Sequence, residues 1–116
     1  MKRPPDQERV YVDATLATYA SLPDTPLRPS RRDRQLAREL CRRCVPLRTV
    51  RAALVLASAR RTLRSGSPLP PVRTLHYFLP AIDEVLRMPP EPGYVSYLEA
   101  KLKPFASKKT ALLGER

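Results

Sequence analysis

The 116-residue chain has little of several residue types on which enzymes and small secreted proteins depend. It contains no tryptophan, three glycines, two cysteines and a single histidine, His76. Two cysteines are too few for a disulfide framework, and three scattered glycines form no glycine-rich phosphate loop. One histidine supplies no Ser-His-Asp set and, with Cys41 and Cys44, does not complete a conventional closed zinc site. We therefore expect a non-enzymatic protein without metal, cofactor or small-molecule substrate.

Long apolar runs and strand patterns are absent as well. No stretch approaches the roughly 20 residues that span a bilayer, and the N-terminal MKRPPDQERVYVDA has no apolar core behind its positive charges. No segment alternates apolar and polar residues as a half-buried strand would, and no repeat recurs at a fixed period. These absences predict a cytoplasmic, all-α protein with no membrane partner.

Proline, by contrast, is abundant, and its fourteen copies divide the chain into segments. Most prolines lie in clusters near the N-terminus and in ranges 23–29, 68–71 and 89–92, and the segments between them carry apolar residues at helical spacing. We predict one small domain of about five helices with proline-rich linkers at residues 10–103, and helices over 10–22, 30–43, 46–64, 72–87 and 94–103. We expect residues 1–9 to be flexible and residues 104–116, which begin at Pro104, to form a basic tail.

Two of these helices have recognisable starts. Ser30 followed three residues later by Asp33 is a weak capping box. Pro80 lies in the middle of VRTLHYFLPAIDEVL, where a proline removes a helical hydrogen bond, so the helix either kinks or ends at Leu79 and restarts at Pro80. A restart is favoured because Asp83 and Glu84 would then lie in the first turn, where acidic groups suit the helix dipole.

The net charge of +11 is distributed unevenly, and 17 of the 22 basic residues are arginines. Residues 28–64 hold twelve arginines against Asp33 and Glu39, a surplus of +10. Arginine suits phosphate because its planar fork donates two hydrogen bonds at once. We expect residues 30–64 to form a basic helical hairpin that contacts the backbone of nucleic acid, DNA in preference to RNA, through Arg31, Arg32, Arg34, Arg38, Arg42, Arg43, Arg48, Arg51, Arg60, Arg61 and Arg64. The alternative is a basic face that only interacts with solvent.

Two other functions of the same region are weaker matches to the sequence. The stretch LARELCRRCVPLRTVRAAL has the outline of a helix-turn-helix, but Cys44 or Val45 stands where the turn usually carries glycine. Cys41 and Cys44 have redox-motif spacing, yet no strand precedes them, so we expect them to pack in the core. Between Arg28 and Arg64 there is no aromatic residue, which argues against a platform that stacks on unpaired bases. Backbone contact is favoured, and a transcriptional regulator stays an alternative.

Five of the seven aromatic residues lie instead in the second half of the chain. We expect this apolar and aromatic surface to contact a protein partner through His76, Tyr77, Phe78, Tyr94 and Tyr97. The chain would then combine nucleic-acid and protein contacts, or serve as a protein-interaction subunit of a larger nucleoprotein complex.

Two patterns, V-P-L-x-x-V-x-x-A-L at residues 45–54 and V-R-T-L-x-Y-F-x-x-x-I-x-x-x-L at residues 72–86, extend this interpretation. Over residues 30–87 the chain resembles the DnaD-like helical domain of bacterial and phage primosome proteins. In that family Tyr, Ile and Trp recur at four-residue intervals, and here Phe78, Ile82 and Leu86 have that spacing with Tyr77 just ahead. The resemblance implies a bacterial DNA-binding protein that acts with a helicase in replication, and a looser similarity to accessory proteins of mobile elements points the same way.

Overall fold

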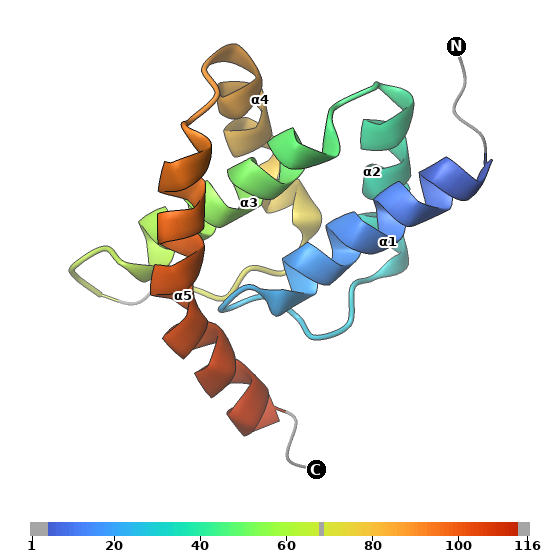
Figure 1. The fold of residues 1–116 in the computed structure, drawn as a ribbon. Helices are drawn as coiled ribbons and strands as arrows, with labels where there is room; N and C mark the ends of the chain where they lie inside the picture. The colour runs from blue at the N-terminus through green and yellow to red at the C-terminus, as the bar shows by residue number, and fades with distance from the viewer. Residues whose placement is uncertain (1–4, 68, 114–116) are drawn as a thin grey trace.

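The computed structural model of the protein describes residues 5–67 and 69–113. This part of the chain folds into α-helices and one short 3-10 helix without a strand, which confirms the all-α prediction (Figure 1). In chain order the elements are α1 (Pro5–Ser21), α2 (Arg31–Arg42), α3 (Leu47–Thr62), the 3-10 helix η1 (Leu75–Phe78), α4 (Leu79–Arg87) and α5 (Pro92–Leu113). The smallest dimension is 21 Å, the thickness of two helices of roughly 10 Å each. The helices therefore form no more than two layers.

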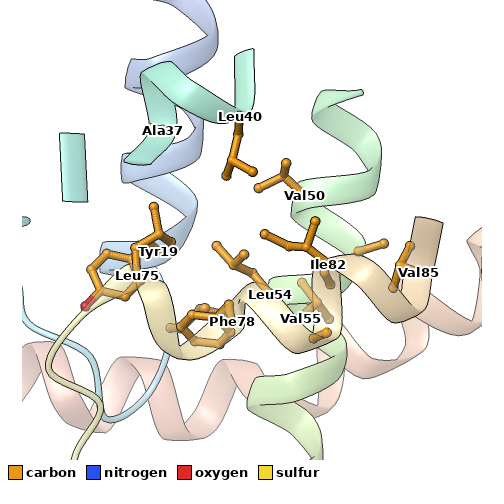
Figure 2. Close-up of a cluster of buried hydrophobic side chains, with 14 of the residues drawn as sticks. Tyr19, Ala37, Leu40, Val50, Leu54, Val55, Leu75, Phe78, Ile82 and Val85 are labelled. Atoms are coloured by element: carbon orange, nitrogen blue, oxygen red, sulfur yellow. The ribbon is translucent and has the colours of Figure 1, made fainter. Parts of the chain in front are cut away.

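The central element is α3, which packs against α1, η1, α4 and α5. Its sequence is apolar or small on almost every side, and small residues such as Ala53 and Ala59 allow the neighbouring helices to approach closely. Figure 2 shows side chains from five elements converging on one core. They are Tyr19 of α1, Ala37 and Leu40 of α2, Val50, Leu54 and Val55 of α3, Leu75 and Phe78 of η1, and Ile82 and Val85 of α4.

The capping box at the start of α2 is confirmed. The Ser30 hydroxyl accepts from the Asp33 backbone N–H at 3.2 Å, and the Asp33 carboxylate accepts from the Ser30 N–H at 2.9 Å. The same carboxylate also accepts from the Leu75 N–H at 2.9 Å and from the Thr74 hydroxyl at 3.2 Å. Asp33 is fully buried, and it therefore fastens the start of η1 to the start of α2.

The break at Pro80 is also confirmed, with a shift of one residue. A 3-10 turn ends at Phe78, and α4 begins at Leu79 with Pro80 in its first turn, where the missing N–H leaves no helical hydrogen bond unmade. Since the helix begins before Pro80, Asp83 and Glu84 lie beyond the first turn rather than in it.

Both predicted ends of the domain differ from the structure. Helix α1 begins at Pro5, so residues 5–9 are helical and not flexible, and α5 continues through Pro104 to Leu113 instead of ending at residue 103. An internal proline costs a helix about 3 kcal/mol, but packing continues past it. Leu102 and Ala106, on either side of Pro104, face the end of α1 across a small cavity that Leu22 also lines. The parts of both predictions that concern residues 1–4 and 114–116 lie outside the described residues.

Candidate nucleic-acid interface

Helix α2 buries one side against the core and exposes arginine on the other. Leu36, Ala37, Leu40 and Cys41 are buried with Asp33, whereas the exposed side chains are five arginines with Gln35 and Glu39. Arg31, Arg34, Arg38 and Arg42 follow each other at intervals of three or four residues, so they share one stripe along the helix. Arg32 and the helix-capping Arg43 lie eleven residues apart and form a second row beside that stripe. The outer face of α2 thus carries two rows of arginine, with Gln35 and Glu39 between them.

Two of the arginines on this stripe are paired with carboxylates of α1. Arg34 lies 3.4 Å from Asp13, and Arg42 lies 3.0 Å from Glu8. Such exposed pairs contribute at most about 1 kcal/mol to stability, but they offset local charge. Within the described residues Arg31, Arg32, Arg38 and Arg43 have no ion pair.

The arginines of α3 are confined to its two ends, because the middle of the helix is buried. Near the start, Arg48 is exposed and Arg51 is paired with Glu99 of α5 at 2.6 Å. Near the end, Arg60 makes a two-bond pair with Glu84 of α4, at 2.8 and 2.6 Å. This hydrogen bonding raises the pKa of Arg60 and lowers the pKa of Glu84.

The structure does not contain the predicted helical hairpin of residues 30–64, because α2 and α3 do not pack against each other along their lengths. Helix α2 packs chiefly on α1, and α3 packs chiefly on α4 and α5. The physical reason is the difference in surface between the two helices, since α2 has one apolar side and α3 is apolar nearly all round. The basic surface consists of α2 and the joint, not of two parallel helices.

The joint between α2 and α3 is a helix C-cap with cysteine in the place that glycine usually takes. Cys44 has a left-handed backbone, with φ of 61°. Its N–H donates to the Cys41 carbonyl at 3.0 Å and the Val45 N–H donates to the Leu40 carbonyl at 3.1 Å, which is the Schellman arrangement. The buried Tyr11 hydroxyl donates to the Val45 carbonyl at 2.7 Å and fixes the joint to α1. No disulfide joins Cys41 and Cys44, and the predicted core packing holds for Cys41 alone, because Cys44 is exposed.

The joint has the length of a helix-turn-helix turn, but α3 is buried along most of its length and lacks the free face of a recognition helix. Its first turns expose Leu47, Arg48 and Arg51, the last of which is paired with Glu99, and near its end Arg60 is exposed but paired with Glu84. A recognition helix contacts base edges through its N-terminal residues, and at that end of α3 Arg48 is the one exposed polar side chain without an ion pair among the described residues. The burial of α3 thus favours contact through α2.

The structure gathers some of the predicted phosphate-binding arginines and separates others. Arg31, Arg32, Arg34, Arg38, Arg42, Arg43 and Arg48 belong to α2, its C-cap and the first turn of α3. Arg51 and Arg60 lie elsewhere on α3, Arg64 lies in the loop that follows it, and Arg61 is buried. A buried Arg61 has no surface to offer a phosphate, so we remove it from the interface. Sequence analysis missed one arginine near this surface, Arg73. Its neighbour in the chain, Thr74, donates a hydrogen bond to Asp33 in the first turn of α2, so the exposed Arg73 lies close to the start of that helix.

The predicted partner-binding residues lie on two elements, and one of them is not at the surface. His76 and Tyr77 are exposed on η1, where the Thr74 hydroxyl lies 3.0 Å from Nδ1 of His76. Phe78 is fully buried, with its ring edge-on to Tyr19, and this corrects the prediction that it contacts a partner. The reason is the 3-10 period of three residues, which points Leu75 and Phe78 the same way into the core.

On α5, Tyr94 and Tyr97 are about half exposed, and their rings are inclined by only 21° with centroids 6.4 Å apart. The Lys101 ammonium group lies 5.6 Å from the centroid of the Tyr97 ring. Two half-exposed aromatic rings, Tyr94 and Tyr97, thus lie close together on α5. Neighbouring exposed apolar groups of this kind often mark a contact surface.

Other kinds of site find no support in the described part of the chain. No group of three or more His, Cys, Asp or Glu side chains could hold a metal ion there. Among the same residues, no helix combines the length and apolar character needed to cross a bilayer. Comparison of the chain with protein-family models, with curated proteins and with solved structures finds no match.

Proposed function

We propose that this protein is a non-enzymatic DNA-binding accessory protein whose α2 face holds the phosphate backbone. The observation that carries the proposal is the arginine-covered outer side of α2. Arg31, Arg32, Arg38 and Arg43, with Arg48 beyond the joint, have no ion pair among the described residues. Guanidinium groups without a carboxylate partner are available to bind phosphate oxygens.

The dimensions of α2 suit a duplex. From Arg31 to Arg43 the helix rises about 18 Å, and duplex DNA carries about ten phosphate charges along that length. No aromatic residue lies on this helix to stack on unpaired bases. We therefore expect duplex DNA to bind at least as tightly as a single strand, with little dependence on sequence.

The number of unpaired arginines sets the expected salt dependence. Five phosphate contacts give a slope of log affinity against log salt of about −4.5. Raising the salt from about 50 to 200 mM should then weaken binding by roughly 500-fold.

The test is fluorescence anisotropy of labelled duplex and single-stranded DNA over that salt range. The triple variant Arg31→Gln, Arg38→Gln, Arg43→Gln should flatten the slope by about three. A matched triple on α4 and α5, Arg87→Gln, Lys101→Gln, Lys103→Gln, removes the same charge far from α2 and should change the slope by less than about one (Figure 1). Binding that is absent at 50 mM salt or independent of salt, or equal loss in both triples, would overturn the proposal.

A role in replication or in mobile-element function is the part of this proposal that rests on the resemblance to the DnaD-like domain. Phe78 and Ile82 of the matching pattern are buried, and Leu86 is 44% exposed at the end of α4. A protein of that kind contacts a helicase as well as DNA. The exposed Tyr94 and Tyr97 rings favour the same combination, since aromatic side chains often anchor protein interfaces.

A protein-interaction subunit is the second candidate function, and the same variants separate it from the first. It predicts that replacing Tyr94 and Tyr97 by serine abolishes complex formation while the α2 triple leaves DNA binding unchanged. A helix-turn-helix regulator predicts instead that one duplex sequence is preferred by several orders of magnitude.

A further inference from the structure

A second concave surface lies at the other end of α3 and does not include α2. The last turns of α3, the loop that follows, η1 and α4 border an open hollow of about 450 Å³, which is within the usual range of small-ligand sites, roughly 300–1,000 Å³. The residues that matter are Arg60, Arg61, Arg64, Leu69 and Tyr77, with Glu84 at the edge. Three guanidinium groups and the Glu84 carboxylate line the pocket, and the Asp24 carboxylate lies 3.7 Å from Arg61, so the local charge is +1.

Arg61 is the most informative of these residues, because only 5% of its side chain is exposed. One of its terminal nitrogens donates to the Pro70 carbonyl, and the nearest carboxylate oxygen, from the largely exposed Asp24, is 3.7 Å away. Its Nε is buried and has no hydrogen-bond partner. A buried charge is costly unless it is well paired, and this guanidinium is only partly compensated by the chain itself.

Arg64 is held at the same pocket by the turn that follows α3. Its Nη1 donates to the Ser67 carbonyl at 2.7 Å. Gly66 has φ of +113°, a backbone conformation that glycine adopts readily, and a Cβ there would lie only 3.6 Å from the Arg64 Nη2. The Arg64 side chain therefore lies across the turn, next to Gly66 and Ser67.

The remaining wall is flat and apolar. Tyr77 is 45% exposed and Leu69 is 40% exposed, and the Arg61 guanidinium carbon lies 5.3 Å from the centroid of the Tyr77 ring. Arg60 is occupied by its two bonds to Glu84 and closes one side. The pocket thus places an aromatic ring beside two guanidinium groups: Arg64, which has no ion pair among the described residues, and Arg61, whose nearest carboxylate oxygen is 3.7 Å away.

We propose that this pocket binds a nucleoside monophosphate unit, with the base against Tyr77 and the phosphate between Arg61 and Arg64. A phosphate monoester carries a charge of about −1.5 to −2 at neutral pH, opposite in sign to the net positive charge of the pocket. The phosphate oxygens of the nucleotide accept the paired hydrogen bonds that a guanidinium group donates. The base of the nucleotide supplies a flat group that stacks on the Tyr77 ring. A free nucleotide and the phosphorylated end of a nucleic-acid strand share this chemistry, and the inference does not depend on DNA binding by α2.

The test is a two-dimensional NMR titration of the full chain with adenosine 5′-monophosphate, adenosine and inorganic phosphate. The monophosphate should shift the amides of Gly66, Leu69, Tyr77 and Ala81, and it should bind more tightly than phosphate or adenosine alone. Arg64→Gln and Tyr77→Leu should each weaken binding about tenfold or more, while the matched surface change Arg87→Gln should alter it less than twofold.

Arg61→Lys keeps the charge of the buried residue but not its planar fork, and it should weaken binding as Arg64→Gln does without loss of fold. Shifts that map elsewhere, no shifts at millimolar monophosphate, or equal affinity in Arg64→Gln and Arg87→Gln would overturn the inference. A short oligonucleotide with a 5′-phosphate, compared with its 5′-hydroxyl form and with the free monophosphate, identifies the source. The α2 triple variant should bind the monophosphate as the wild type does, so failure of DNA binding and failure of this pocket are distinguishable.

Discussion

Replacing Asp33 with asparagine changes no volume in the interior, and we expect it to destabilise the fold by about 3 kcal/mol. The carboxylate accepts three hydrogen bonds, from the N–H groups of Ser30 and Leu75 and from the Thr74 hydroxyl. Asparagine keeps one oxygen for Leu75 and Thr74 but turns an amide donor toward the Ser30 N–H. Losing the Ser30 bond costs about 1 kcal/mol, and removing the charge from the other two bonds costs about 1 kcal/mol each.

The pKa of Asp33 adds a pH dependence with a defined sign. Burial alone would raise this pKa, but the bonds from Leu75, Ser30 and Thr74 outweigh burial and hold it below the ordinary value. Because the folded pKa is the lower one, the unfolded chain binds the proton more readily. The stabilisation is complete above about pH 4 and disappears as the pH falls through the lowered folded value. The difference between wild type and Asp33→Asn should therefore shrink on acidification.

Urea unfolding followed by circular dichroism measures this difference at pH 7 and at several acidic values. A loss of about 3 kcal/mol moves the urea midpoint by about 1 to 3 M. Asp13→Asn is the matched control, since it removes an exposed carboxylate that pairs with Arg34, and it should cost less than about 1 kcal/mol. If Asp33→Asn unfolded at the same urea concentration as that control, the assigned role of the buried carboxylate would be refuted.

Two further changes test the joint and the charge balance of α2. Cys44→Gly should stabilise the protein by about 0.5 to 1 kcal/mol because Cys44 has a left-handed backbone, while Cys44→Ala, which keeps that cost, should change the urea midpoint little. Lower stability of the glycine variant would contradict this account. Glu8→Gln with Asp13→Asn releases Arg42 and Arg34, so DNA should bind more tightly, with a salt slope steeper by about two. An unchanged slope in the anisotropy assay would show that those two arginines make no contact.

Local signals in the sequence predicted most of the helices, because helix starts and apolar spacing involve residues close in the chain. Ser30 and Asp33 are three residues apart, and their capping box is readable for that reason. The bond from Asp33 to Leu75 spans 42 residues, and no local pattern announces it. The aromatic cluster His76, Tyr77 and Phe78 does not show which of its members is buried, because that depends on the three-residue period of η1, which turns Phe78 into the core. Pro104 was read as a helix end, although packing of Leu102 and Ala106 continues the helix through it.

The sequence places the candidate interface only approximately. The net charge of a segment does not include carboxylates from other segments that lie beside it in the fold. The surplus of +10 over residues 28–64 meets carboxylates that come from other segments. Glu8 and Asp13 of α1 face α2, Glu84 of α4 faces Arg60, and Glu99 of α5 faces Arg51. Among the described residues, this leaves the unpaired arginines concentrated on one helix and its joint.

The two proposed sites differ in how exposed their arginines are, and so they should differ in how strongly salt weakens binding. On α2 the arginines are exposed groups on a convex helix, so they suit a long polyanion and should respond strongly to salt. At the end of α3, Arg61 is 5% exposed and Arg64 is held by the Ser67 carbonyl, so they suit one small anion in a fixed place. Buried pairs are screened less by salt than exposed ones. Monophosphate binding should therefore weaken far less than DNA binding when the salt concentration rises from about 50 to 200 mM. Equal salt dependence at both sites would contradict this, because Arg61 and Arg64 would then act as ordinary surface charges.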